Sequence, residues 1–503
     1  MRSINKQQLI GWLLCLPLIG KSQEIVTLSV QANEPSVVFS PLHNHQIVAA
    51  SNINSIYFLD TATQQYQSIQ AQSKYGVYGD PVLHNTGDKL YYAHLSKTPK
   101  KGYGDWFDRI VIQEIYALNP WLETSYGVGY NPPKMQDKPW LSSDNHSKNF
   151  HGNLYVTWTE FDHYESSNKD DFSRIRFSKL TPQSDTFSEA ITISDTVGDC
   201  LDGDHTLEGV TTAVGPQGEI YAAWAGHEKI WFDKSMDGGK TWGKDQAIAH
   251  QSEGWDMEMP NIMRANGMPF LVCDTSRNTL YITWADEENN NANIWLMHSK
   301  DGGNSWSSKI KVSAETGHQY FPNIAIDQKY GDVYIAYYDQ QFSSKSFFYD
   351  IGLNRINIEN PKRNFYHRIT PQSIPLPGHQ IFYGDYLDLD ITPDSIAIVF
   401  TSYDLHQTSV KLYSTSLNQI KTALLNTPFN CTVIPINKAL LLAVNIQKSC
   451  TLSYEYTYRK WLLYRKFRGQ RIFTEKDVNQ DFIIDKIPFR SYKHLKYTFQ
   501  EVN

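Results

Sequence analysis

A short hydrophobic pattern that recurs seven times constrains the fold of this 503-residue chain more than any other feature. Each copy has a turn residue, an apolar residue that is usually Tyr, and then small or β-branched residues that end in an aromatic. Each copy predicts a strand buried on both faces, with a turn at its head. The clear copies are GNLYVTW (152–158), GEIYAAW (218–224), NTLYITW (278–284) and GDVYIAY (331–337), and the weaker ones are NSIYFLD (54–60), DKLYYAH (88–94) and DSIAIVF (394–400).

Further strands accompany each copy. A short strand precedes it, and proline, which lacks a ladder donor and is tolerated at the first residue of a strand, opens five of these strands: Pro35, Pro81, Pro139, Pro269 and Pro322. A third strand follows, as in RIVIQEI (109–115) and VKLYSTS (410–416). Seven such units without a long helical pattern predict an all-β chain whose residues 23–420 form a seven-bladed β-propeller. The alternative, a β-helix, would have shorter and more regular rungs. IVTLSV (25–30) is a candidate for the outer strand of the last blade.

The two ends of the chain differ from the repeat. Residues 1–22 predict a signal peptide, with Arg2 and Lys6 before an apolar run and small residues before the cleavage point. The run is too short to span a bilayer comfortably, so we expect a secreted, periplasmic or cell-surface protein. A buried N-terminal strand or helix is the alternative.

Residues 421–503 predict a small basic β-rich domain, of the β-sandwich kind, with 14 Lys and Arg against six Asp and Glu. Such a tail either makes a peripheral contact with an anionic glycan or membrane surface, or is a packing domain with solvated lysines.

Two segments share a sharper motif, S-x-D-x-G-x-[TS]-W: SMDGGKTW (235–242) and SKDGGNSW (299–306). Asp-Gly-Gly is hairpin-turn chemistry, because glycine supplies positive φ and the Asp side chain bonds nearby backbone N–H groups. The motif resembles the Asp box, or BNR repeat, of sialidases and their relatives. The likeness to exported bacterial sialidase-like propellers extends over most of residues 35–420. It implies that both boxes are structural turns between third and fourth strands, on the face opposite the active site.

In a propeller, the loops that lead into the innermost strands gather at one mouth with the loops between second and third strands. Acids, a tyrosine and basic residues that meet there are plausible glycosidase chemistry. The catalytic candidates are Asp80, Glu208, Tyr320 and Asp385, and the substrate-binding candidates are Arg109, Lys138 and Arg264.

The resemblance implies a mechanism in which three arginines clamp a sugar carboxylate and a glutamate activates a tyrosine nucleophile. Tyr320 and Glu208 are the residues that fit this pair. The Arg-Ile-Pro motif of the family is absent, since the corresponding region reads NEPSVV (33–38) or YGDPVL (78–83). Two functions are therefore expected. One is an exported glycoside hydrolase that acts on an acidic sugar of extracellular glycans or cell-surface polysaccharide, and the other is a non-catalytic propeller that binds glycan or protein at the cell surface.

Several of these residues also have structural interpretations. Asp80 and Asp385 both follow glycine, where an Asp often caps a turn, and Lys138 could form a surface pair with Asp137. Glu208 is either a turn residue or, with Asp202 and Asp204, an oxygen ligand of a structural calcium. We expect no required cofactor, no catalytic metal and no nucleic-acid partner.

Overall fold

The computed structural model describes residues 25–503 except 98–105, 117–124, 253, 289, 314–315, 343–347, 405–406, 421–428, 437–438, 447–449, 461–462, 474–480, 489–491 and 502–503. Its description of side chains ends at Ile420. The predicted signal peptide lies outside the described residues.

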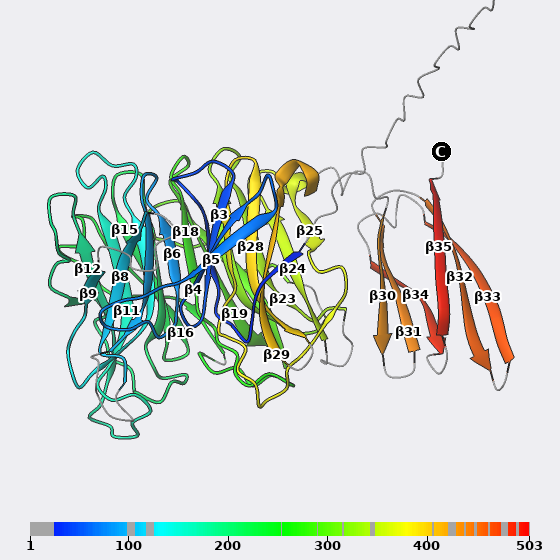
Figure 1. The fold of residues 1–503 in the computed structure, drawn as a ribbon, viewed down its shortest axis with the longest axis horizontal. Coiled ribbons are helices and arrows are strands. Elements are labelled where there is room, and N and C mark those ends of the chain that lie inside the picture. The colour runs from blue at the N-terminus through cyan, green and yellow to red at the C-terminus, as the bar shows by residue number, and fades with distance from the viewer. Residues whose placement is uncertain are drawn as a thin grey trace, which may run out of the picture.

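Seven antiparallel sheets make up residues 25–420, which confirms the seven-bladed β-propeller (Figure 1). The first three blades, from innermost to outermost strand, are β2 (Ser36–Phe39), β3 (Gln46–Ser51), β4 (Ser55–Asp60) and β5 (Gln65–Gln70); β6 (Val82–Asn85), β7 (Leu90–Ser96), β8 (Arg109–Ile115) and β9 (Ser125–Val128); and β10 (Met135–Ser143), β11 (Leu154–Phe161), β12 (Ser173–Leu180) and β13 (Ile191–Thr192).

The next three blades are β14 (Glu208–Val214), β15 (Ile220–Gly226), β16 (Lys229–Ser235) and β17 (Gln246–His250); β18 (Phe270–Asp274), β19 (Thr279–Glu288), β20 (Asn291–Ser299) and β21 (Ile310–Lys311); and β22 (Gln319–Asp327), β23 (Asp332–Asp339), β24 (Phe348–Ile356) and β25 (Phe365–Arg368). In this sixth blade β26 (Ile374–Pro375) also pairs with β24, and a short 3-10 helix, η1 (Pro361–Arg363), precedes β25.

The seventh blade closes the ring by joining the two ends of the propeller sequence. Its strands are β27 (Asp388–Ile391), β28 (Ser395–Asp404) and β29 (Gln407–Ser416), and β1 (Ile25–Val30) is its outermost strand. The β1 strand pairs antiparallel with β29, with Ile25 opposite Tyr413. The expectation for residues 25–30 is confirmed.

Six of the seven repeat copies are second strands, and one is not. β7, β11, β15, β19, β23 and β28 coincide with the expected segments. NSIYFLD instead forms β4, the third strand of the first blade, so its predicted place was wrong. The pattern reports burial on both faces, and β4 shares that burial with its neighbour β3, the true second strand.

Both Asp boxes are turns between third and fourth strands, as expected. In the second box the Asp301 carboxylate accepts hydrogen bonds from the Ser299 hydroxyl at 2.8 Å and from the Ser305 N–H at 2.9 Å. Trp306 then packs edge-on against Phe232 of the preceding blade, with ring centroids 5.3 Å apart. Trp242 of the first box packs in the same way on Phe177, at 5.1 Å. The boxes therefore join neighbouring blades.

The innermost strands carry strained residues at corresponding positions. Four non-glycine residues directly before a proline have left-handed φ values: Glu34 (46°), Asp80 (49°), Lys138 (48°) and Phe321 (49°). In β10 and β22 this position lies in an irregularity of the ladder, between Asp137 and Trp140 and between Tyr320 and Asn323. Such backbone strain persists only where the surroundings fix it, and it is common at binding sites.

The tail contains six strands: β30 (Phe429–Ile436), β31 (Ala439–Ile446), β32 (Cys450–Lys460), β33 (Leu463–Phe473), β34 (Asp481–Pro488) and β35 (Tyr492–Glu501). They pair as two three-stranded sheets, β30-β31-β34 and β33-β32-β35. A separate β-sandwich domain there stays a prediction. Among the described residues, no helix has the length and apolarity needed to cross a membrane.

Candidate functional site

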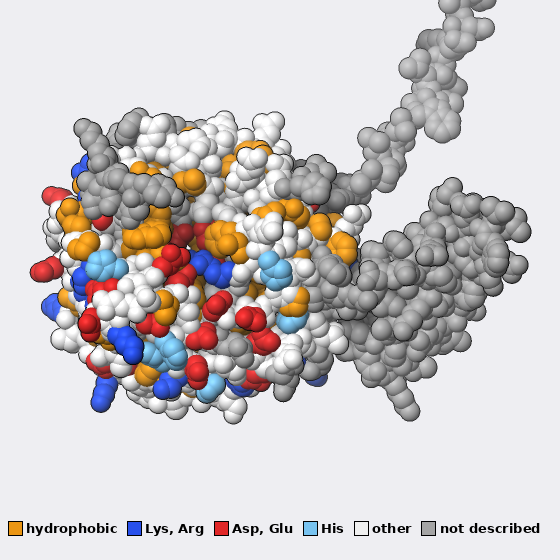
Figure 2. Space-filling model, turned by 90° about the horizontal axis from the view of Figure 1, so that it is seen from below, with side chains coloured by type: hydrophobic (Ala, Val, Ile, Leu, Met, Phe, Trp, Pro, Cys, Tyr) orange, Lys and Arg blue, Asp and Glu red, His pale blue; other side chains and the backbone are white. Residues whose placement is uncertain are grey.

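The loops that lead into the innermost strands meet at one end of the ring, which we call the mouth. Figure 2 looks at this end and shows acidic and basic side chains meeting near the middle of the face, with hydrophobic side chains beside them. Eight charged residues from loops and innermost strands form what we call the axial cluster: Glu34, Asp80, Asp137, Lys138, Asp202, Glu208, Arg264 and Asp385. Of the seven predicted site residues, five belong to it: Asp80, Lys138, Glu208, Arg264 and Asp385.

Lys138 and Asp385 tie opposite sides of the ring together. The Lys138 Nζ lies 2.7 Å from the Asp385 Oδ2, although the two residues come from the third blade and the loop into the seventh. Because these blades are not neighbours, the contact must lie at the axis. Lys138 and Asp137 are 6% and 7% exposed, so the alternative of a surface pair is wrong. Burial disfavours the charge on Lys138, but Asp385 and Asp80 outweigh it and raise the pKa of the ammonium well above its usual value.

Arg264 is the most exposed cation of the cluster. Its Nε donates to the Asp385 Oδ1 at 3.0 Å, and its Nη1 donates to the Asp202 Oδ2 at 2.7 Å. Its side chain keeps 26% exposure, whereas that of Asp385 is fully buried. Burial disfavours the charge on Asp385, yet Arg264 and Lys138 outweigh it and lower the pKa of this carboxyl. Asp385 is thus an ionised anchor that orients both cations.

Glu208 and Asp202 form a carboxyl pair with opposite pKa shifts. Burial raises the pKa of Glu208 well above its usual value, and the charge of Asp202 raises it further. Burial also disfavours the charge on Asp202, but its hydrogen bond with Glu208 and the charge of Arg264 prevail and lower its pKa. Within the described part of the chain, neither Glu208 oxygen has a hydrogen-bond donor. Of the two, Glu208 therefore favours the protonated form and shares its proton with Asp202, which favours the ionised form.

Two further acids near Lys138 have raised pKa values. Burial raises the pKa of Asp137 to about 8, against the opposing charge of Lys138. Burial, with the charge of Asp80, also raises the pKa of Glu34 well above its usual value. The sequence analysis missed Glu34, although it occupies the same position before a proline as Asp80 and Lys138.

Tyr320 lies in a separate cluster of aromatic residues. It is fully buried, and its hydroxyl accepts a hydrogen bond from the Tyr383 hydroxyl at 2.6 Å. Tyr338 stacks on it with ring centroids 5.3 Å apart. Burial raises the pKa of Tyr320, which disfavours a phenolate. No described hydrogen bond joins Tyr320 to Glu208, and its role as a nucleophile stays a prediction.

Arg109 lies at the mouth end of the third strand of the second blade. Its guanidinium is held between the rings of Tyr75 and Tyr130, 4.1 Å from each centroid, and its Nε donates to the Asp108 carboxylate at 2.7 Å. The described contacts of Arg109 include none of the axial cluster.

Exposed aromatic side chains extend from Arg109 toward the cluster. Trp106, 41% exposed, packs on Tyr164 at 5.0 Å, and the Tyr164 hydroxyl donates to Asp202 at 2.6 Å. Tyr78 and Tyr130 are also exposed on loops of the mouth. We call Tyr78, Trp106, Tyr130 and Tyr164 the aromatic rim.

The calcium expectation concerns Asp202, Asp204 and Glu208. Over the described residues, no group of three or more His, Cys, Asp and Glu side chains is arranged to hold a metal ion. Asp204 accepts a hydrogen bond from the Asp256 N–H at 3.0 Å. A structural calcium stays a prediction.

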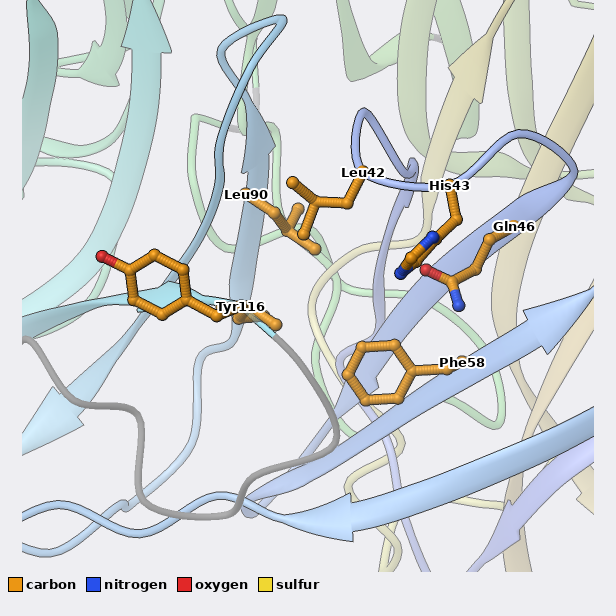
Figure 3. Close-up of a pocket in the computed structure, with 7 residues that line it drawn as sticks. Leu42, His43, Gln46, Phe58, Leu90 and Tyr116 are labelled. Carbon is orange, nitrogen blue, oxygen red and sulfur yellow. The ribbon is translucent and has the colours of Figure 1, made fainter.

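A pocket of about 280 Å³ lies away from the mouth, between the first and second blades (Figure 3). Leu42 and His43 line it from the loop between β2 and β3, and that loop lies at the end of the ring opposite the mouth. None of the predicted site residues lines this pocket.

No protein-family model matches the chain, and no curated protein matches it. Among solved structures the matches are distant. An ulvan lyase of polysaccharide lyase family PL25, bound to a GlcA(1-4)Rha3S fragment, has a TM-score of 0.46 and 10% identity, covering 80% of this chain and 99% of its own. A Trypanosoma rangeli sialidase with 2,3-difluorosialic acid, a covalent intermediate, has a TM-score of 0.44 and 8% identity, covering 95% and 87%. A Hadza microbial sialidase has a TM-score of 0.39 and 11% identity, covering 75% of each chain. Likeness at this level says nothing of the chain's activity.

Proposed function

We propose that this chain is an exported carbohydrate-active propeller that hydrolyses a glycosidic bond of an extracellular glycan at its mouth. The observation that carries the proposal is the Glu208–Asp202 pair. Two adjoining carboxyls whose surroundings push their pKa values apart are the usual arrangement of an acid and its partner in catalysis. The pKa of Glu208 is raised well above its usual value, whereas that of Asp202 is lowered.

Glu208 acts as the general acid in this proposal. Its proton passes to the glycosidic oxygen, and the bond from that oxygen to the anomeric carbon breaks with the electron pair left on oxygen. Water then adds to the anomeric carbon and loses its proton to a carboxylate. Asp80 is suited to receive this proton, because its Oδ2 has no hydrogen-bond donor among the described residues and lies 3.8 Å from the Lys138 Nζ.

The aromatic rim supports a sugar ligand. Sugar rings present C–H groups on their faces, and these pack on the electron-rich faces of aromatic side chains. Trp106 and Tyr164 connect the exposed rim to Asp202, so a glycan that packs on the rim would reach the cluster. The predicted acidic sugar has less support than the glycan itself, because Lys138 and Arg264 already have carboxylate partners.

The test is the release of reducing ends from a panel of neutral, amino and uronate-bearing polysaccharides by the full-length secreted protein. We expect wild type to act on at least one of them, and Glu208→Gln to lower the rate by about 10²- to 10⁴-fold, the usual contribution of a general acid. Glu228→Gln, an exposed change in the same blade, should leave the rate unchanged. The proposal fails if wild type is inert on the whole panel or if Glu208→Gln matches it.

A second candidate is binding without catalysis, and the exposure of Trp106 favours it. In that case wild type binds glycans on an array and cleaves none of them. Trp106→Ala abolishes this binding, and the Glu208→Gln variant, like wild type, cleaves no glycan.

A further inference from the structure

We propose that the axial cluster recognises a protonated amino group, so that the glycan it acts on contains free amino sugars. This inference rests on the proposed function and adds the class of substrate to it. It concerns the charge and the hydrogen-bonding capacity of the cluster.

The cluster has more acids than cations, and its cations are already neutralised. It contains six acidic residues and two basic ones, and even with Glu34, Asp137 and Glu208 protonated the three remaining acids outnumber the two cations. Lys138 lies between Asp385, at 2.7 Å, and Asp80, at 3.8 Å. Arg264 contacts Asp385 and Asp202. An incoming sulfate or carboxylate would meet cations whose charge is balanced and would lie beside several acids, which is unfavourable.

The second observation is a set of buried acceptors without donors. Apart from the proton that Glu208 shares with Asp202, no described group donates a hydrogen bond to the Glu208 oxygens, the Asp80 Oδ2 or the Asp202 Oδ1, and these atoms are shielded from solvent. Glu208 as a whole is 1% exposed. Buried acceptors that remain unpaired cost stability, and their presence at one place indicates a ligand that brings donors.

An ammonium group matches both the excess of acids and the unpaired buried acceptors. It carries three N–H donors and no acceptor, and its positive charge compensates the excess of acids. A neutral hydroxyl offers one donor and no charge, while an N-acetyl group offers one N–H and adds a carbonyl acceptor. Because a bound cation favours the charged form of a carboxyl, binding should release the proton of Glu208.

The experiment measures calorimetric binding to the full-length protein at about pH 6, where an amine of this type is protonated. The probes are a glucosamine tetramer with free amines, its N-acetylated counterpart and a glucuronate tetramer. We expect the free-amine tetramer to bind at least about tenfold more tightly than either of the others, with proton release that differs between buffers of different ionisation enthalpy. Glu208→Gln should reduce the preference to about twofold or less and remove the proton release, while Glu228→Gln should keep both.

Equal or tighter binding of the N-acetylated or glucuronate probe would overturn the inference. Should Glu208→Gln not fold, Asp80→Asn provides the second variant, and it must also weaken the preference for the free amine. Failure of the proposed function looks different: the free-amine probe binds selectively, yet wild type releases no reducing ends from any polysaccharide. Conversely, hydrolysis of neutral or acidic glycans without preference for the amine keeps the function and discards the inference.

Discussion

Asp137 shows how the position of one residue changes its chemistry. In the sequence it stands beside Lys138 and looks like half of a surface ion pair. In the structure it is buried, and its carboxyl accepts the Lys138 N–H at 2.9 Å while Lys138 itself pairs with Asp385 and Asp80. Burial raises the pKa of Asp137 to about 8, with Asp80 and Asp202 adding to the shift and Lys138 opposing it.

A dependence of stability on pH follows. In the unfolded chain the pKa of Asp137 is near 3.8, and in the folded chain it is about 8. Between these values the folded state binds one proton more than the unfolded state, so this group makes stability fall as pH rises through the window. Asp137→Asn removes the effect. We expect the variant to gain stability over wild type between about pH 4 and pH 8, by up to about 1 kcal/mol per pH unit.

Urea unfolding of both proteins at several pH values measures this difference. Asp88→Asn, an exposed change on a turn of the second blade, is the control and should show no such trend. A difference between Asp137→Asn and wild type that stays constant from pH 4 to pH 8 would contradict the burial of a protonated Asp137.

The sequence located five of the seven predicted site residues at the axis, because the position ahead of an innermost strand is readable from the repeat. It did not predict which residues form ion pairs with them. Contacts such as Lys138–Asp385 join blades far apart in the chain and depend on the radius and closure of the ring. The left-handed φ of Glu34, Asp80 and Lys138 was also unpredictable, since a residue before proline is normally extended. Phe321 shares the register of these residues, and Tyr320, one residue before it, is turned into a buried cluster of tyrosines.

At the scale of elements, the two Asp boxes are turns with the same hydrogen-bond pattern in neighbouring blades. Each Asp carboxylate accepts from the hydroxyl four residues later (Thr241 or Ser305), from backbone N–H groups of its own turn and from the Ser hydroxyl two residues earlier. These bonds lower the pKa of Asp237 and of Asp301 to about 2. Beneath each turn, a lysine of the preceding blade donates to a backbone carbonyl, as Lys234 does to Gly302 at 2.8 Å. The motif was recognisable in the sequence because turn chemistry is local.

The error at NSIYFLD arose because burial, which that pattern reports, is shared by second and third strands.

Because the two Asp boxes have the same hydrogen bonds, removing the Asp carboxylate should lower the stability of the protein by a similar amount in each. We expect Asp237→Ala and Asp301→Ala each to lower the free energy of unfolding by about 1–2 kcal/mol, since each removes several hydrogen bonds to a carboxylate. Lys300→Ala, which loses only an exposed ion pair to Glu359 at 3.5 Å, should cost about 0.5 kcal/mol or less. Urea denaturation measures all three. A neutral Asp301→Ala beside a costly Asp237→Ala would show that the two boxes are not equivalent.

At the scale of the whole molecule, stability depends on how a circular array of blades is closed. β1 completes the seventh blade, so a strand from the start of the propeller sequence pairs with β29 near its end. Leu28 of β1 is buried in a cluster with Val37 and Ile47 of the first blade and Val410 and Leu412 of the seventh. The cluster that buries Leu28 therefore spans both sides of the closure. Glu34, four residues after the end of β1, belongs to the axial cluster, so the same segment of chain contributes to both the closure and the mouth.

Closure can be tested within β1 itself. Leu28 is 5% exposed and Val30 is 57% exposed, so the two residues form a matched pair on one strand. Leu28→Ala should cost about 2–5 kcal/mol through lost apolar burial and the cavity it leaves, while Val30→Ala should change stability by about 0.5 kcal/mol or less. Because the lost contacts span the closure, amide hydrogen exchange should also accelerate in β29 (Gln407–Ser416) more than in β15 (Ile220–Gly226), on a distant blade. Equal costs for the two variants, or exchange that accelerates uniformly around the ring, would mean that β1 is not what holds the first and seventh blades together.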